Sequence, residues 1–254
     1  MKAVWAIATL TWKEAVRNRI LYLLVFFAAF LVSGSWIISQ LTIGDELKII
    51  KDMGLGAIHF FGILITIFIG MGLIFREMEK RTIYLILSKP VQRYQFLLGK
   101  FIGLALTLFV VLCALGTIFY VLLLLKGGAE PRVLFALYFF YLEWLLVAGI
   151  AVVFSSFSTP LLSTMLTMTS FFAGHLTQSL LLLQSRIESE SGKSVLSALY
   201  YLLPNLELFN VRAQIVHRLA IPSQLVLDAT LYWALDLSAL LLFAILLFQK
   251  KDFT

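Results

Sequence analysis

Long apolar runs separated by short polar segments are the dominant pattern along this sequence. Each run is about 20 residues or longer, which is enough for a helix to cross the roughly 30 Å hydrocarbon core of a membrane. We expect six such spans, at residues 20–41, 54–75, 96–125, 133–153, 161–183 and 225–248. Helices are required there because lipid offers backbone N–H and C=O groups no hydrogen-bond partners. The pattern predicts an all-α, polytopic membrane protein with one domain over residues 1–254.

The first 19 residues have a different pattern. Trp5, Ala8, Trp12 and Val16 recur at helical spacing, and charged residues occupy the other faces. Tryptophan side chains favour the membrane–water interface. Residues 1–19 are therefore predicted to form an amphipathic helix that lies along the membrane surface.

The longest segment outside the spans, residues 184–224, lies between the fifth and sixth of them. Its apolar run at 195–203 is too short to cross a membrane, and Pro204-Asn205 interrupts it. We expect short re-entrant helices on the extracytoplasmic side. Two interpretations remain open, namely a cap that packs on the ends of the spans and a gate that shapes the exit of a substrate.

A charged stretch at residues 76–100 separates the second span from the third. Its bases outnumber its acids, Glu77 and Glu79. The basic residues are Arg76, Lys80, Arg81, Lys89, Arg93 and Lys100. A short helix is expected before Pro90, because proline lacks a backbone donor and disfavours helix at the residue before it. The stretch is either a loop that sets orientation or a docking surface for a cytoplasmic partner.

Composition supports the membrane assignment and the charges predict its orientation. The chain is 61% hydrophobic with a mean hydropathy of +0.97, whereas soluble domains are about 45–50% apolar. Six spans place both termini on one side, together with residues 76–95. That side carries a clear excess of Lys and Arg, while acids balance the bases on the other. By the positive-inside rule both termini are predicted to be cytoplasmic. The net charge of +6 then indicates that cytoplasmic loops lie against anionic lipid, and not that the chain binds nucleic acid.

The sequence offers few motifs that carry chemistry. Gly192-Lys193-Ser194 ends like a phosphate-binding loop, but Ile187 occupies the position of the required first glycine. The three histidines (His59, His175 and His217) lie on separate segments, so we expect no metal site. The single cysteine, Cys113, excludes an intrachain disulfide. We expect no catalytic residue, cofactor or metal on this chain.

Two carboxylates fall inside predicted spans, where a charge costs at least about 2.5–3.5 kcal/mol. Glu143 is in the fourth span and Asp236 in the sixth. No Lys or Arg lies at their depth, so His175 and fifth-span hydroxyls such as Thr167 are the candidate partners. These groups either hold the spans together by hydrogen bonds or line a transport route.

The charged stretch resembles the segment after the second span of type-2 ABC transporter permeases. The matching residues are Glu77, Glu79, Thr82, Ile83, Ile86, Leu87, Ser88, Pro90, Val91, Arg93, Gln95 and Leu97–Lys100. Arg81 stands where these permeases often have glycine. The N-terminal Trp12-Lys13-Glu14, the Leu203-Pro204-Asn205 segment and the terminal Lys-Lys-Asp also match their layout. The pattern is similar to that of the membrane subunit of the nitrous-oxide-reductase maturation transporter and its relatives.

The resemblance implies an exporter permease, which itself is not an enzyme. A dimer of separate cytoplasmic ABC ATPase subunits would bind ATP and Mg²⁺, and a second permease subunit, favoured as an identical copy, would complete the transporter. The ATPase-coupling residues would be Glu77, Glu79, Lys80, Arg81, Thr82, Tyr84, Ser88 and Pro90. The expected location is the bacterial inner membrane. Two alternatives stay open: a proton-coupled transporter that uses Glu143 and Asp236, and a non-transporting scaffold or intramembrane enzyme.

Overall fold

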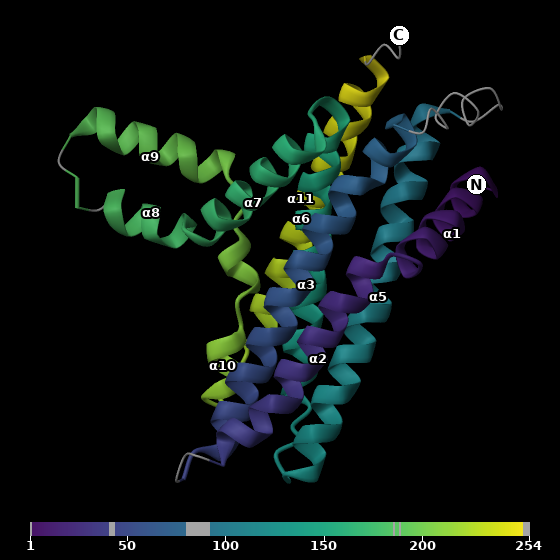
Figure 1. Cartoon of the computed structure of the whole chain (residues 1–254). Helices are drawn as coiled ribbons and strands as arrows, with labels where there is room; N and C mark the ends of the chain where they lie inside the picture. The colour runs from purple at the N-terminus through teal and green to yellow at the C-terminus, as the bar shows by residue number, and fades with distance from the viewer. Residues whose placement is uncertain (1, 41–43, 80–91, 185, 188, 251–254) are drawn as a thin grey trace.

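Helices of very different lengths make up the structure. The computed structural model describes residues 2–40, 44–79, 92–184, 186–187 and 189–250, but not the side chains of residues 73–79, 178, 181, 202 and 250. The helices are α1 (Lys2–Val16), α2 (Arg19–Ser39), α3 (Glu46–Glu79), α5 (Arg93–Leu125), α6 (Arg132–Phe157), α7 (Pro160–His175), α8 (Thr177–Gln184), α9 (Glu190–Leu202), the 3-10 helix η1 (Leu206–Phe209), α10 (Arg212–Val216) and α11 (Ser223–Lys250). Their arrangement is shown in Figure 1.

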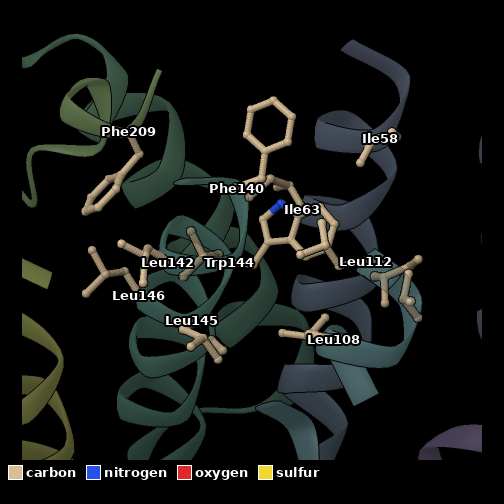
Figure 2. Packing of buried hydrophobic residues seen from close by; sticks show 14 of the residues in the cluster. Ile58, Ile63, Leu108, Leu112, Phe140, Leu142, Trp144, Leu145, Leu146 and Phe209 are labelled. Carbon is tan, nitrogen blue, oxygen red and sulfur yellow. The ribbon is translucent and has the colours of Figure 1, made fainter. Parts of the chain in front are cut away.

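The central element is α6, which is apolar on every side. Its residues 142–153 are all buried, and α3, α5, α7 and α11 pack around it. A helix that is apolar all round is stable only when neighbours cover it on every face. Figure 2 shows part of this core, which includes Trp144 and Phe140 of α6, Ile63 of α3 and Leu112 of α5.

The two termini lie toward the same end of the bundle (Figure 1). α2 and α5 run away from that end, while α3, α6 and α11 run toward it. We call this the terminal end, and the opposite end, which contains residues 44–46, 126–131 and 217–222, the loop end. The predicted placement of both termini on one side of the spans agrees with this arrangement.

Five helices in the described part of the chain are long and apolar enough to cross a membrane. They are Arg19–Ser39, Glu46–Gly72, Arg93–Leu125, Arg132–Phe157 and Ser223–Gln249. The all-α, polytopic fold is confirmed. The expected fifth span is the exception, because residues 161–183 do not form one helix. They are divided into α7 and α8, with the break at Leu176.

Contacts with the segment after α9 explain this break. Gly174 lies so close to that segment that a side chain there would meet the Pro204 carbonyl oxygen at 2.7 Å and Leu206 at 2.8 Å. The buried Thr177 hydroxyl bonds to the Gly174 carbonyl oxygen and to Asn205 Oδ1, both at 3.0 Å. Orphan carbonyls at a helix end need such partners. These tertiary contacts therefore end the helix at a point where the sequence predicted a continuous span.

The helices α8 and α9 pack on each other as a hairpin that projects sideways from the bundle (Figure 1). A hydrogen bond of 2.8 Å joins Gln184 of α8 to Ser197 of α9. The prediction of short helices in residues 184–224 is confirmed by α9, η1 and α10. Of the two open interpretations, a cap over the span ends does not describe α9, which packs on α8 beside the bundle. The elements η1 and α10 do pack on the bundle.

Two of the predicted loops are in fact helical. The charged segment at residues 46–52 precedes the predicted span 54–75 but forms the first turns of α3. Likewise α6 continues through Phe157 into the segment between the predicted fourth and fifth spans. Pro160 then begins α7 at its first turn, where the missing N–H of proline costs nothing. These spans extend beyond their apolar cores because charged and hydroxyl side chains still fit at helix ends.

The N-terminal helix α1 packs along the first half of α5. A side chain at Gly99 would collide with Ile7 and Val4, and one at Gly103 would collide with Thr11 and Ala8. The small residues of α5 thus permit close contact with α1. On the other face of α1, Trp5 is 59% exposed, as expected for an interfacial helix.

Candidate functional site

A buried polar cluster lies inside the bundle, centred on Glu143 of α6. This carboxylate is fully buried and both of its oxygens face histidines. His59 Nε2 of α3 lies 2.8 Å from Glu143 Oε2, and His175 Nε2 of α7 lies 3.0 Å from Oε1. Glu143 is thus held between two imidazoles from two other helices.

The second ring nitrogen of His175 extends the cluster toward η1. His175 Nδ1 lies 3.1 Å from Glu207 Oε2, and Asn210 Nδ2 donates to Glu207 Oε1 at 2.9 Å. Both ring nitrogens of His175 therefore face carboxylates. Four segments that are far apart in sequence, α3, α6, α7 and η1 with its C-cap, meet here. We call this group the His–Glu cluster (His59, Glu143, His175, Glu207 and Asn210).

Aromatic rings enclose the two histidines. The His59 ring lies 4.8 Å from Phe140, and the His175 ring lies 4.8 Å from Phe171 and 6.1 Å from His59. The histidine side chains keep partial exposure, 23% for His59 and 21% for His175, whereas that of Glu143 is 1%. The buried Glu143 carboxylate therefore depends on its two histidine partners, because water cannot replace a lost partner there.

The structure confirms one of the candidate partners of Glu143 and adds another. His175 was a candidate from the sequence, while His59 was not. Thr167 does not join the cluster: its hydroxyl donates to the Ser163 carbonyl oxygen of its own helix at 2.7 Å. The sequence could have identified His59 as a candidate, since a histidine within a predicted span needs a polar partner just as a carboxylate does. Two of the three histidines are thus close together despite lying on separate segments.

Asp236 lies in a different setting on α11. Its carboxyl group hydrogen-bonds to Tyr232, whose hydroxyl in turn accepts the Asn205 backbone N–H at 2.8 Å. Asp236 Oδ2 is buried without a hydrogen-bond partner among the described residues. Asp236 therefore supports the Pro204-Asn205 segment from α11. Among the described residues, Asp236 forms no hydrogen bond or ion pair with Glu143.

Several of the predicted coupling residues lie outside the described residues. These are Lys80, Arg81, Thr82, Tyr84, Ser88 and Pro90. Glu77 and Glu79 are in the last turns of α3, at the terminal end. α3 ends at Glu79 and α5 begins at Arg93, so the described residues on either side of 80–91 lie at that end (Figure 1).

Two bases of the charged stretch are engaged within the chain. Arg93 Nη1 donates to the carbonyl oxygens of Gln249 at 2.8 Å and Phe248 at 3.3 Å. A cation at a helix C-terminus satisfies orphan carbonyls and complements the helix dipole. The buried Lys100 pairs with Glu14 of α1 at 3.3 Å. These two residues therefore join α5 to α11 and to α1.

At the loop end, ion pairs connect the helices that meet there. Lys51 is buried and binds Glu130 at 2.8 Å, and Arg218 binds the same carboxylate at 3.0 Å. Arg212 binds Asp52 at 2.8 Å. The acids and bases that balance each other on this side in the sequence thus form ion pairs in the structure. An open hollow of about 820 Å³ lies among α2, α3 and α10, and its lining includes Asp52, Met53, Asn210 and Arg212.

The comparison with protein families decides the class of protein. The model of the family described as "ABC-2 family transporter protein" matches residues 5–253. The chain belongs to the ABC-2 transporter family. A comparison with curated proteins finds no match.

Membership in the ABC-2 family agrees with the helices described above. The chain is a multi-pass membrane protein and the membrane component of an ABC transporter. The family implies pairing with a cytoplasmic ABC ATPase. The narrower likeness to the nitrous-oxide-reductase maturation transporter stays a prediction.

Proposed function

We propose that this ABC-2 protein is the permease subunit of an exporter and couples ATP hydrolysis on a separate cytoplasmic subunit to substrate movement. The observation that carries the proposal is the family match across residues 5–253. The terminal end would face the cytoplasm, because the excess of basic residues lies on that side of the spans. The location we propose is the bacterial inner membrane.

The terminal end offers a direct route from an ATPase to the spans. A partner that docks on residues 76–95 would push on the end of α3 and the start of α5. Lys100 and its partner Glu14 would pass that movement to α1, and Arg93 would pass it to α11. Charged and hydrogen-bonded contacts of this kind keep separate helices in a fixed relation. The ATPase, and not this chain, would bind ATP and Mg²⁺.

The transporter would contain two permease subunits, which we propose to be identical copies. Closed twofold assemblies of identical chains are the commonest oligomers. The exit for substrate would lie at the loop end, where the 820 Å³ hollow opens beside α10.

Capture of the partner tests the proposal. The full chain is solubilised from membranes of cells that express it at its native level, and its partners are identified by peptide sequence and ATPase activity. We expect an ABC ATPase with the native chain. The triple variant Lys80→Glu, Arg81→Glu, Tyr84→Glu should lose it.

The α8–α9 hairpin offers a matched control of two bases and one tyrosine. Arg186→Glu, Lys193→Glu and Tyr201→Glu change the same charges, with Arg186 and Tyr201 exposed and Lys193 partly exposed, and this variant should retain the ATPase. Recovery of no ATPase by a well-folded native chain would overturn the proposal and favour a proton-coupled transporter that uses Glu143 and Asp236.

A further inference from the structure

The His–Glu cluster presents the donor set of a metal site. The ligand atoms of His59, Glu143 and His175 all lie within 4.8 Å of one another. Two imidazoles and one carboxylate suit a divalent transition-metal ion, and with Zn²⁺ such a set leaves a fourth position open. Zn²⁺ binds nitrogen and carboxylate oxygen at about 2.0–2.2 Å, so its ligand atoms lie a little over 3 Å apart. Small movements of the two rings would bring all three donors to that spacing.

The contacts of His175 give an independent reason to expect a metal. Its two ring nitrogens face two carboxylates, 3.0 Å from Glu143 and 3.1 Å from Glu207. A neutral imidazole carries only one N–H and can donate to only one of them. With a metal on Nε2, the Nδ1–H donates to Glu207 and both nitrogens are satisfied. A ligand histidine whose other nitrogen binds a carboxylate is the usual arrangement in metal sites.

Charge balance leads to the same conclusion. Glu143 is fully buried, and among the described residues its side chain contacts the two histidines as polar partners. One divalent cation would neutralise Glu143 and Glu207 together without protonating either histidine. Buried charges are stable when they are paired or coordinate a metal.

The cluster adjoins the loop-end hollow through Asn210. Asn210 lines the 820 Å³ hollow and also donates to Glu207. Asp52, which lines the same hollow, lies seven residues before His59 and therefore on the same face of α3. His59 and His175 keep about a fifth of their side-chain surface exposed.

We propose that His59, Glu143 and His175 bind one divalent transition-metal ion, with Zn²⁺ the best fit, and that Glu207 orients His175. The ion would fasten α7 to α3 and α6 just before the break at Leu176. This inference concerns a binding site on this chain, and it holds or fails independently of the ATPase.

Metal titration of the purified full chain in detergent tests the proposal. The probes are Zn²⁺ by calorimetry and Co²⁺ by its visible absorption, which reports coordination geometry. We expect one ion per chain and an intense visible Co²⁺ spectrum that Zn²⁺ abolishes. His59→Gln should weaken binding by at least tenfold. Glu207→Gln should weaken it by about 10–100-fold, the usual effect of a residue that orients a ligand.

His217→Gln is the matched control, because it is the same substitution at an exposed histidine by the loop-end hollow. It should leave the titration unchanged. Glu143→Gln adds a further test if the variant folds, but the conclusion rests on His59→Gln, which alters a partly exposed ring. Absence of stoichiometric binding by the native chain would overturn the proposal. Equal losses in His59→Gln and His217→Gln would also overturn it.

Discussion

At the scale of single residues, close contact between α3 and α6 brings His59 to Glu143. Gly62 follows His59 by one helical turn and faces Trp144, which follows Glu143 directly. The Trp144 ring occupies the space that a side chain at position 62 would fill. Trp144 is fully buried in the core shown in Figure 2. The absence of a side chain at one position thus sets how near the imidazole and the carboxylate can lie.

This contact predicts that Gly62→Ala destabilises the protein by about 1–3 kcal/mol, the usual cost of overpacking a dense core. The measurement is the midpoint of thermal unfolding in detergent, followed by circular dichroism. Gly34→Ala on α2 is the matched control, because nothing lies within 4 Å of the new methyl group. It should be neutral or slightly stabilising, since alanine favours helix over glycine. Equal midpoints for the two variants would contradict the packing argument.

At the scale of elements, the break between α7 and α8 depends on contacts with the segment at residues 203–211. Thr177 is fully buried, and its hydroxyl serves both Gly174 and Asn205. From α11, Tyr232 holds the Asn205 backbone, and from α7, His175 holds Glu207. The break therefore positions the polar cluster as well as redirecting the chain into the α8–α9 hairpin.

Thr177→Val tests this role while it keeps the shape of the side chain. We expect a loss of about 1–3 kcal/mol in the free energy of unfolding, because the Gly174 and Asn205 oxygens lose a buried donor. Hydrogen exchange should also become faster in residues 203–211. Thr177→Ser keeps the hydroxyl and should show little of this increase in exchange. The same exchange rates in Thr177→Val and the native chain would show that the hydroxyl does not hold the segment.

At the scale of the whole molecule, the ion pairs of the loop end join α3, the 126–131 turn and the end of α10. The hydrogen bond from the Lys51 ammonium lowers the pKa of the Glu130 carboxyl below its usual 4.5, and the charges of Lys51, Arg218 and Arg132 add to this, although partial burial opposes it. A carboxyl whose pKa is lower in the folded state stabilises the fold above its unfolded pKa. That contribution is lost as the pH falls through the folded-state value.

We therefore expect the native chain to lose stability as the pH falls from about 5 to below 4, and Glu130→Gln to lose less over this range. At pH 7 Glu130→Gln should be the less stable of the two, because the buried Lys51 loses its charged partner. Thermal midpoints across this pH range measure both effects. Glu46→Gln removes a more exposed pair with Lys126 and should change the profile less. If the thermal midpoints of Glu130→Gln and the native chain changed with pH in parallel, ionised Glu130 would not contribute to the pH dependence of stability.

The sequence alone determined the fold class, the positions of most spans and the family. An apolar run must form a helix in lipid, since its backbone groups have no other partners, and this holds whatever the rest of the chain does. It also identified Glu143 as a buried charge in need of a partner and His175 as a candidate. The resemblance carried by residues 77–100 agrees with the family match, although part of that segment lies outside the described residues.

Only the tertiary structure decided which polar groups meet. His59 and His175 are 84 and 32 residues from Glu143, and the crossing of α3, α6 and α7 brings them together. The break at Leu176 could not be predicted either, because residues 161–183 are apolar enough to continue as one helix. Contacts from Pro204, Asn205 and Leu206 override that local preference. Local pattern sets the membrane helices, whereas close packing of distant segments creates the polar site between them.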